Sequence, residues 1–484
     1  MIDEKLIERL RDIVGEEYVI WGSDDLLLYE YDGSIDRSPP GAVALPGSAE
    51  ELAECVKAAH EYDANIVPRG AGTGLSGGAV PLHDSVVLPV TRLNRVLEVD
   101  VENRVAIVEP GLVNIELSEA VAQYGLYYAP DPSSQRACTI GGNVAENAGG
   151  PHCLALGVTT NHVLGIEVVL ADGEKVWLGG TSRDTFGFDL RGAFIGSEGT
   201  LGIVTKVAVR LMRKPEAVLT MLAAFRSLDD ASQSVSDIIG AGMVPAAIEM
   251  MDRVTIDACE PVYHPGYPDD AEAVLIVELD GLRETVDEQG QRVREICRAN
   301  NSSEIREAED DEKRAELWAT RKGAIGAFGT IAPNYYLVDG VVPRTKLRDV
   351  MRQVREIGEE LGLTIGNVFH AGDGNLHPCI LFDGRDRAQV RRVIECGERI
   401  LEACINAGGA LSGEHGIGIE KQAYMPLVFT EADMAAMAML RPAFGAGERF
   451  NPGKVFPGGA VHGSAYGISE DAFRATGPGA LQAV

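Results

Sequence analysis

Residues 68–80 read Pro-Arg-Gly-Ala-Gly-Thr-Gly-Leu-Ser-Gly-Gly-Ala-Val and indicate the architecture more directly than any other segment. Five glycines in thirteen residues allow the backbone to turn its N–H groups inward around an anion such as a phosphate. The pattern Gly-x-Gly-x-x-Gly is present, but a Rossmann dinucleotide site needs a helix directly after the loop. Here Gly78 and Pro81 lead instead into a second β-rich run at 85–90. The segment therefore predicts strand, glycine loop and strand, with a pyrophosphate held by loop amides alone.

Two further glycine-rich blocks follow. Residues 130–150 include Pro-Asp-Pro-Ser-Ser and Thr-Ile-Gly-Gly-Asn-Val-Ala-Glu-Asn-Ala-Gly-Gly, a run of small residues without hydrophobic periodicity. Residues 196–203 read Gly-Ser-Glu-Gly-Thr-Leu-Gly-Ile and stand just before a β-branched run. We expect the block at 130–150 to build no core and to lie flat against a large planar ligand, with a long surface loop as the alternative. Together the three loops indicate one extended cofactor wrapped by main chain.

Composition limits the possible functions. A chain of 484 residues is too long for one core, so two or three domains are expected. Its net charge of −30 argues against binding nucleic acid, which needs a basic face. Neither a secretory signal nor an apolar run of ~18 residues is visible, which predicts a cytoplasmic protein. The eight scattered cysteines lack a Cys-x-x-Cys pair and are expected to be reduced thiols, not ligands of an iron–sulfur cluster.

The spacing of apolar residues divides the chain into four stretches. Residues 1–215 are expected to form one domain. Within it, residues 1–36 predict a charged amphipathic helix and a polar lead-in, and residues 41–215 alternate β-branched runs with glycine turns, interrupted by a predicted helix at 49–62. Residues 216–419 alternate longer helices with strands, which is typical of an antiparallel α+β domain. Residues 420–457 predict a helical closing segment, and the Gly/Ala/Ser-rich residues 458–484 predict a disordered tail.

Three histidines in glycine-flanked loops mark the C-terminal half as the place for chemistry. His370 and His377 flank a Gly-Asp-Gly-Asn turn between two predicted strands, so their imidazoles can converge at one end of a hairpin. Glu414 and His415 stand in Leu-Ser-Gly-Glu-His-Gly-Ile-Gly, residues 411–418. Two histidines and one glutamate form an open ligand set that can hold a divalent metal. Because no motif fixes this spacing, metal binding and a structural role both stay open.

The three glycine-rich blocks resemble the FAD-binding domain of the vanillyl-alcohol oxidase/p-cresol methylhydroxylase superfamily. The resemblance implies an α+β fold, in which a two-part FAD-binding domain joins a cap domain with an antiparallel sheet. It implies that 68–80 cradles the FAD pyrophosphate, while 130–150 and 196–203 embrace the isoalloxazine and adenine ends. Thr73 stands where some members carry a flavin-tethering histidine, so non-covalent FAD is implied. The residues implied to bind FAD are Pro68, Arg69, Gly70, Ala71, Gly72, Thr73, Gly74, Leu75, Ser76, Pro130, Asp131, Ser134, Thr139, Gly142, Asn143, Asn147, Gly149, Glu198, Gly202, Ile203 and Asn451.

From about residue 20 to 457 the chain is similar to the FAD-linked D-2-hydroxyacid dehydrogenases. The likeness is greatest to the glycolate oxidase flavoprotein subunits and extends to D-lactate and D-2-hydroxyglutarate dehydrogenases. The resemblance implies that His370, His377 and Glu414 ligate a divalent metal, Zn, Mn or Fe. It implies that His415 is the catalytic base and that Arg321 binds the substrate carboxylate.

One departure from the family concerns substrate size. The hydroxyglutarate enzymes carry a lysine about fifteen residues after the arginine, for a second carboxylate, and here Tyr336 stands there. This favours a small monocarboxylate, glycolate or D-lactate, over a dicarboxylate. The family implies an iron–sulfur partner subunit, a further flavin subunit or a quinone as electron acceptor, with peripheral association at the inner face of the membrane through such partners. A homodimer is also left open.

Two alternatives stay open. The substrate can be another D-2-hydroxyacid, including D-2-hydroxyglutarate, because one methylene discriminates by only ~1–3 kcal/mol. From a different class, the chain can be a metal-dependent hydrolase whose His/Glu cluster activates water and whose glycine loops bind a nucleotide substrate.

Overall fold

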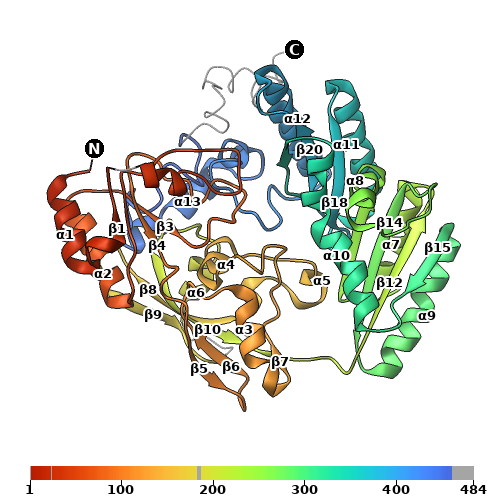
Figure 1. The fold of residues 1–484 in the computed structure, drawn as a ribbon, viewed down its shortest axis with the longest axis horizontal. Coiled ribbons are helices and arrows are strands. Elements are labelled where there is room, and N and C mark those ends of the chain that lie inside the picture. Colours follow the sequence, from red (N-terminus) through yellow and green to blue (C-terminus); the bar gives the residue numbers. More distant parts are fainter. Residues whose placement is uncertain (1, 23, 183–186, 460–484) are drawn as a thin grey trace. The chain divides into compact units, whose positions relative to one another are not determined.

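The computed structural model describes residues 2–22, 24–182 and 187–459, which divide into two compact units (Figure 1). Unit 1 contains Met1–Gly149, Val158–Lys214 and Glu414–Val484, and unit 2 contains Gly150–Gly157 and Pro215–Gly413. Residues 460–484 of the predicted tail lie outside the described residues.

The first sheet of unit 1 carries the glycine loop. Its strand order is β1 (Val19–Ile20), β2 (Ala42–Ala44), β4 (Val86–Pro89) and β3 (Ile66–Arg69). Strands β3 and β4 run parallel, with Ile66 opposite Val86, and the glycine loop joins them without a helix. The predicted order of strand, glycine loop and strand is therefore confirmed.

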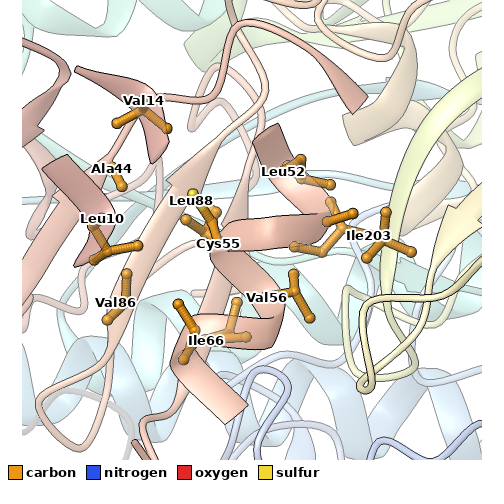
Figure 2. Close-up of a cluster of buried hydrophobic side chains, with 14 of the residues drawn as sticks. Leu10, Val14, Ala44, Leu52, Cys55, Val56, Ile66, Val86, Leu88 and Ile203 are labelled. Carbon is orange, nitrogen blue, oxygen red and sulfur yellow. The ribbon is translucent and has the colours of Figure 1, made fainter. Parts of the chain in front are cut away.

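Helices α1 (Glu4–Val14) and α2 (Ala49–Glu61) pack on this sheet. Ser48 caps the N-terminus of α2: its Oγ accepts a hydrogen bond of 3.1 Å from the backbone N–H of Glu51. Its apolar residues recur at helical spacing and form a core with the strands, as Figure 2 shows for Leu52, Val56 and Leu88. The predicted helix at 49–62 is thus present and ends one residue earlier.

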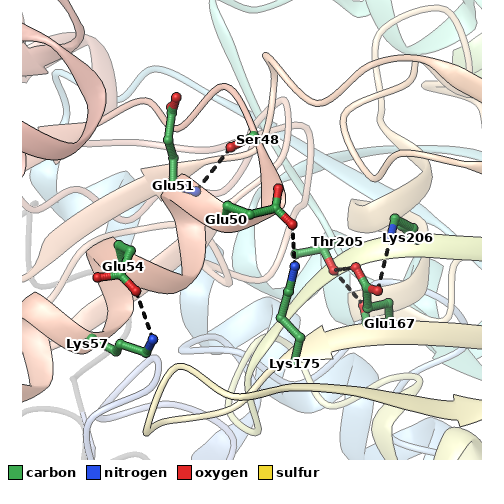
Figure 3. A network of polar contacts seen from close by, with 9 residues as sticks. All are labelled: Ser48, Glu50, Glu51, Glu54, Lys57, Glu167, Lys175, Thr205 and Lys206. Carbon is green, nitrogen blue, oxygen red and sulfur yellow. Dashed lines mark hydrogen bonds and ion pairs between the residues drawn. The ribbon is translucent and has the colours of Figure 1, made fainter.

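A second, antiparallel sheet completes the strand structure of unit 1. Its order is β5 (Val96–Asp100), β6 (Val105–Val108), β10 (Ile203–Arg210), β8 (Val163–Val169) and β9 (Lys175–Gly179). Polar contacts line it and connect it to α2: Glu50 pairs with Lys175, and Glu167 accepts hydrogen bonds from Thr205 and Lys206 (Figure 3). Exposed ion pairs of this kind contribute little stability. The smaller elements are β7 (Leu126–Tyr127) paired with β11 (Met212–Arg213), α3 (Asn114–Val121) and α6 (Leu190–Phe194).

The glycine-rich block at 130–150 contains a helix, α4 (Ile140–Glu146). Thr139 caps it by accepting a hydrogen bond of 3.2 Å from the N–H of Gly142. Ile140 and Val144, four residues apart on one side of the helix, are buried in the core of the second sheet. The expectation that this block builds no core is therefore wrong, because it contains a capped helix that buries Ile140 and Val144.

The C-terminal residues of unit 1 return to the first sheet. They include a 3₁₀ segment (Gln422–Leu427), α13 (Glu431–Ala438) and α14 (Leu440–Ala443). The N–H of Ile66 in β3 then donates to the carbonyl of Arg449 at 2.9 Å, and the N–H of Asn451 donates to the carbonyl of Ile66 at 2.8 Å. The segment at 449–451 is thus hydrogen-bonded to the strand that leads into the glycine loop.

Unit 2 is built on an antiparallel sheet, as predicted. Its order is β15 (Ser302–Glu307), β12 (Ala217–Phe225), β14 (Ala273–Gly281), β13 (Ala247–Asp252), β18 (Thr364–His370), β19 (Asn375–Leu376) and β17 (Gly340–Val341). Strand β20 (Pro378–Phe382) pairs with β18 and with β16 (Asn334–Leu337).

Helices pack on both faces of this sheet. Leu219 of β12 contacts Gly290 of α9 (Arg283–Ala299), whereas Thr220, the next residue, faces the side on which α10 (Asp311–Ala327) lies. Contacts with these strands place α7 (Leu228–Gly240) with α9, and α8 (Arg253–Tyr263) with α10. Helices α11 (Leu347–Leu361) and α12 (Arg387–Asn406) pack together beside β18 and β20, and α5 (Cys153–Leu156) contacts β13. None of the helices in the described residues has the length and apolar character that crossing a bilayer requires.

Candidate functional site

The glycine loop after β3 is fixed from outside. Gly72 and Gly77 have φ of +71° and +82°, which side chains rarely adopt. The N–H of Ala79 donates to Asp32 Oδ2 at 3.2 Å, and Arg69 Nη1 donates to the carbonyl of Ala79 at 3.3 Å. The N–H of Gly33 donates to the carbonyl of Gly74 at 2.8 Å. These hydrogen bonds tie the loop to Asp32, Gly33 and Arg69 of unit 1.

Two observations inside this loop fit a ligand. Gly74 has no positive φ, and a Cβ built on it meets only Glu146 Oε1, at 4.0 Å, so the protein alone does not require glycine there. Ser76 is fully buried, and its Oγ has no hydrogen-bond partner among the described residues. A buried hydroxyl without a partner needs an explanation. Close approach of a large cofactor explains both, and the residues present thus fit FAD.

Several residues predicted to contact the cofactor also form hydrogen bonds within the protein. Asn143 Oδ1 accepts from Asn114 Nδ2 at 3.0 Å, and Asn147 Oδ1 accepts from the N–H of Thr160 at 2.9 Å. Asn451 Nδ2 donates to the carbonyls of Gly78 and Glu198, at 2.9 and 2.7 Å. These side chains hold the loops in place. The other predicted residues lie at the end of β3 (Pro68, Arg69), in its loop (Gly70–Ser76), before or within the second block (Pro130, Asp131, Ser134, Thr139, Gly142, Gly149) and at the start of β10 (Gly202, Ile203).

Glu198 connects two of the loops in unit 1. Its carboxylate accepts hydrogen bonds from the backbone N–H groups of Ile417 and Gly418, at 2.7 and 2.6 Å. These residues follow His415, so Glu198 fixes the segment that carries the predicted catalytic base. Gly416, which lies between His415 and Ile417, has φ +86°, and a Cβ there would overlap the carboxylate of Glu146.

Sequence reasoning missed a buried charged group beside this loop. Lys454 Nζ donates to the carbonyl of Gly78 at 2.7 Å, and burial lowers the pKa of Lys454 to about 7. Burial also raises the pKa of Glu146 well above its usual value, and the nearby carboxylates of Glu198 and Asp32 raise it further. Two features of the sequence could have indicated these residues. Glu146 is a charged residue inside a run of small residues, and Lys454 stands three residues after Asn451.

In unit 2, the two predicted metal-binding histidines lie together. His370 ends β18 and His377 lies between β19 and β20, and their ring centroids are 5.1 Å apart with an angle of 88° between the planes. Both side chains are buried. Gly374 in the turn has φ +73°, and a Cβ there would overlap the carbonyl of Val342. The turn thus brings the imidazoles together as the hairpin pattern predicts.

Glu249, which sequence reasoning missed, joins His370 to Arg321. It lies on β13 directly opposite His370 on β18, and its Oε1 is 2.7 Å from His370 Nδ1. Its Oε2 forms an ion pair with Nη2 of Arg321 on α10, at 2.5 Å. Burial raises the pKa of Glu249, but the charge of Arg321 and the hydrogen bond with His370 outweigh burial and hold the pKa below its usual value. The sequence feature that could have indicated Glu249 is that it is the one charged residue in the apolar run 247–251.

Arg321 keeps part of its hydrogen-bonding capacity. The residue is 3 % exposed, and its Nε has no hydrogen-bond partner among the described residues. A guanidinium has five N–H donors in a planar fork, so a buried Nε–H without an acceptor marks a place for a ligand oxygen. The predicted role of Arg321 in binding a carboxylate is compatible with this geometry.

A second cluster of the same residue types lies beside the first. Glu278 on β14 accepts from Arg314 Nε and Nη2, at 2.9 and 2.7 Å, and from Trp318 Nε1 at 2.7 Å. His152 Nε2 lies 3.2 Å from Glu278 Oε1, and Thr220 Oγ1 donates to Oε2 at 2.6 Å. Burial raises the pKa of Glu278, but hydrogen bonds from His152 and Arg314 outweigh burial and leave the pKa far below its usual value. This cluster was also missed.

The chain leaves unit 2 next to the histidine turn. Asp339 accepts hydrogen bonds from Ser412 Oγ at 2.6 Å and from the N–H of Gly413 at 3.0 Å. A Cβ on Gly413 would overlap Asn375, which lies in the turn between the two histidines. Glu414, the third predicted metal ligand, follows Gly413 in the chain and is the first residue of this part of unit 1, with His415 next.

Tyr336, the residue behind the substrate-size prediction, is buried on β16 and packs against Gly397 of α12. It has a role in packing, and the preference for a monocarboxylate stays a prediction.

Comparison with solved structures identifies the fold. A p-cresol methylhydroxylase with bound substrate superposes with a TM-score of 0.79 over 93% of this chain and 96% of that chain, at 17% identity. The 4-ethylphenol oxidase from Gulosibacter chungangensis gives 0.78 over 94% and 97%, at 20% identity. The fold is thus that of the vanillyl-alcohol oxidase/p-cresol methylhydroxylase flavoproteins, and the predicted fold class is confirmed.

Sequence comparison defines the family more narrowly. Residues 40–179 match the FAD binding domain family, and residues 214–455 match the FAD linked oxidases, C-terminal domain. The glycolate oxidase subunit GlcD of Escherichia coli K12 is 44% identical over 93% of this chain and 90% of its own length. GlcD of Bacillus subtilis 168 is 38% identical over 94% and 97%, and a probable mitochondrial D-lactate dehydrogenase of Danio rerio is 32% identical over 93% and 92%. The chain belongs to the FAD-linked oxidases, in the group of the 2-hydroxyacid dehydrogenases, with FAD as its cofactor. The hydrolase alternative is therefore not retained.

Proposed function

We propose that this enzyme oxidises a small D-2-hydroxyacid, glycolate or D-lactate, to the corresponding 2-oxoacid. The observation that carries the proposal is Arg321, a buried guanidinium whose Nε–H lacks an acceptor in the part of the chain that the structure describes. A carboxylate is the anion that matches a guanidinium fork in shape and charge. The printed functions of the relatives, glycolate oxidase and D-lactate dehydrogenase, point to the same substrate class.

We propose further that His370, His377 and Glu414 hold a divalent ion, Zn, Mn or Fe. The two histidines support this because they are buried with their rings 5.1 Å apart. Glu414 follows Gly413, whose position beside Asn375 is fixed by Asp339. Such an ion, when bound, supplies a Lewis acid that lowers the pKa of a substrate hydroxyl.

In the proposed reaction, Arg321 binds and orients the substrate carboxylate, and His415 takes the proton of the α-hydroxyl. Bound FAD would supply the two-electron oxidant for the conversion of the α-C–OH group to C=O. Glu198 supports the role of His415, because it fixes the backbone at Ile417 and Gly418.

The electrons leave through an acceptor other than NAD. The names of the bacterial relatives describe a subunit, which supports a partner subunit as the acceptor, and a quinone is the alternative. Any membrane association of this chain would then come through such a partner. The main alternative substrate is D-2-hydroxyglutarate. Tyr336 packs against Gly397 of α12 and supports neither this dicarboxylate nor a monocarboxylate.

The test is turnover of purified, FAD-loaded enzyme with an artificial dye acceptor and a panel of 2-hydroxyacids. We expect activity with glycolate or D-lactate, little with L-lactate, and weak activity with D-2-hydroxyglutarate. A preference for the dicarboxylate would contradict the proposed substrate class, and inactivity with all D-2-hydroxyacids would contradict the proposed function. Metal analysis of the same preparation tests the proposed ion separately.

A further inference from the structure

We infer that Glu249 is a positioning residue that serves both parts of the proposed site at once. One carboxylate oxygen orients His370 for the metal, and the other orients Arg321 for the substrate carboxylate. The inference rests on the proposed function and adds a residue that neither sequence reasoning nor the comparisons identify.

The sheet register creates the first contact. Glu249 on β13 and His370 on β18 are direct cross-strand partners, so their side chains leave the sheet on the same face. Oε1 of Glu249 lies 2.7 Å from Nδ1 of His370. An ionised carboxylate can only accept, so Nδ1 carries the proton and Nε2 is left with the lone pair that a metal needs. A carboxylate behind a ligating histidine commonly fixes its ring in this way.

Helix α10 supplies the second contact. Nη2 of Arg321 forms an ion pair with Glu249 Oε2 at 2.5 Å, and Glu249 and Arg321 are 1 % and 3 % exposed. The ion pair engages Nη2, whereas Nε has no partner within residues 2–22, 24–182 and 187–459. The long Arg321 side chain is therefore fixed at one point, with donor capacity kept for a ligand.

The neighbouring cluster provides a matched control inside the same sheet. Glu249 lies opposite Ile276 and Glu278 lies opposite Ala247, so the two glutamates point to the same face as diagonal neighbours, about 7–8 Å apart. Arg314 and Arg321 are two helical turns apart on one side of α10. Arg314, however, uses both Nε and Nη2 on Glu278, and Thr220 and Trp318 fill the remaining positions on this carboxylate. The Glu278 cluster is thus saturated.

The substitution Glu249→Gln separates positioning from simple burial. A glutamine keeps one acceptor oxygen but replaces the other with an NH₂ group, which opposes an N–H of His370 or of Arg321. We therefore expect Glu249→Gln to lower the affinity for Zn²⁺ by roughly 10–100-fold, the usual effect of losing such a partner. Binding of a substrate-like carboxylate should weaken in parallel, while FAD content stays at the wild-type level.

The experiment uses FAD-loaded enzyme stripped of metal. Wild type, Glu249→Gln and Glu278→Gln are each titrated with Zn²⁺ against a chromogenic chelator, and flavin content and thermal unfolding are recorded on the same samples. We expect wild-type Zn²⁺ affinity in Glu278→Gln despite lower stability, and weakened affinity in Glu249→Gln. If Glu249→Gln does not fold, Glu249→Asp takes its place, because its shorter carboxylate cannot span both partners.

Three outcomes would overturn the inference. Wild-type Zn²⁺ affinity in the Glu249 variant would mean that Glu249 does not position His370. Equal loss of affinity in the Glu249 and Glu278 variants would reduce both residues to a structural role. Absence of a Zn²⁺ site in the wild type would overturn the proposed metal as well, which distinguishes failure of the proposed function from failure of the role of Glu249.

Discussion

The Glu249 and Glu278 clusters use the same three residue types on one face of one sheet, yet they differ in what they leave available. Glu278 has both oxygens filled, and its arginine is bound through two nitrogens of the fork. Glu249 binds its arginine through Nη2, while Nε of Arg321 has no acceptor among the described residues. Buried polar groups are normally satisfied, so the incomplete cluster marks function and the complete one marks architecture. Residue type alone would not separate them.

The largest effect on the rate of flavin reduction is expected at His415, which belongs to neither cluster. The effects of the cluster variants can be compared with it. The substitution His415→Ala should slow flavin reduction by roughly 10²–10⁴-fold, because a general base contributes about that much. FAD should remain bound, since the glycine loops are untouched. Rapid-mixing absorbance spectroscopy of flavin reduction checks this, with flavin content measured on the same sample. A decrease of less than tenfold would remove His415 as the base.

The saturated cluster should contribute stability and not catalysis. Replacing Glu278 by Gln removes the charge that satisfies Arg314 and introduces an NH₂ group among donors. We expect the free energy of unfolding to fall by about 1–3 kcal/mol, the usual range for a buried charged hydrogen bond. Denaturant unfolding, followed for wild type and Glu278→Gln, measures this. A variant as stable as wild type but inactive would reverse the roles assigned to the two clusters.

The same cluster predicts a pH dependence of stability. The pKa of Glu278 in the folded protein lies far below its usual value, so its contribution is complete above the pKa of unfolded glutamate, about 4.3. The contribution is lost as the pH falls below that value and the group approaches its folded pKa. The stability difference between wild type and Glu278→Gln should therefore shrink on acidification. A difference that stays constant or grows would show that Glu278 is not ionised in the native state.

The glycine loop permits a similar comparison, between a glycine that the backbone conformation requires and a glycine that leaves room for the ligand. The expected effect on stability is the smallest of those considered. Gly74→Val should deplete FAD while leaving the apoprotein about as stable as wild type, because a Cβ there meets only Glu146 at 4.0 Å. Gly77→Val should lower both the FAD content and the stability of the apoprotein. Gly77 has φ +82°, and a Cβ there would lie only 3.0 Å from the side chain of Ile419. Flavin content and apoprotein unfolding of the two variants check the difference. Full FAD loading of Gly74→Val would exclude Gly74 from the cofactor site.

The parts that were predictable from sequence depend on local chemistry. Glycines with positive φ, such as Gly72 and Gly374, mark tight backbone turns wherever they occur, so the glycine loop and the histidine hairpin were both found. The amphipathic spacing of α2 likewise identifies itself within one segment. Helix α4 was missed because Gly141 and Gly142, which disfavour a helix, stand between its buried residues Ile140 and Val144. The cap at Thr139 was not recognised.

The parts that were not predictable depend on register. Glu249 meets His370 across 121 residues of chain, and only the pairing of β13 with β18 brings the two together. Glu278 and Arg314 meet in the same way, through α10 lying on the sheet. A single charge inside an apolar strand is the one local signal for such residues, because burying it is costly without a partner. That signal indicates that a partner exists but does not identify it.

The most direct test of the account compares the two arginines of α10. Arg321→Ala and Arg314→Ala are mixed anaerobically with glycolate or D-lactate, and the loss of oxidised-flavin absorbance is followed. We predict that Arg321→Ala reduces the second-order rate of flavin reduction by the equivalent of about 2–5 kcal/mol, the cost of removing one partner of a buried charged pair. Arg321→Lys should recover only part of it. Arg314→Ala should keep nearly the wild-type rate with lower stability. Flavin reduction at the wild-type rate in Arg321→Ala would contradict the account.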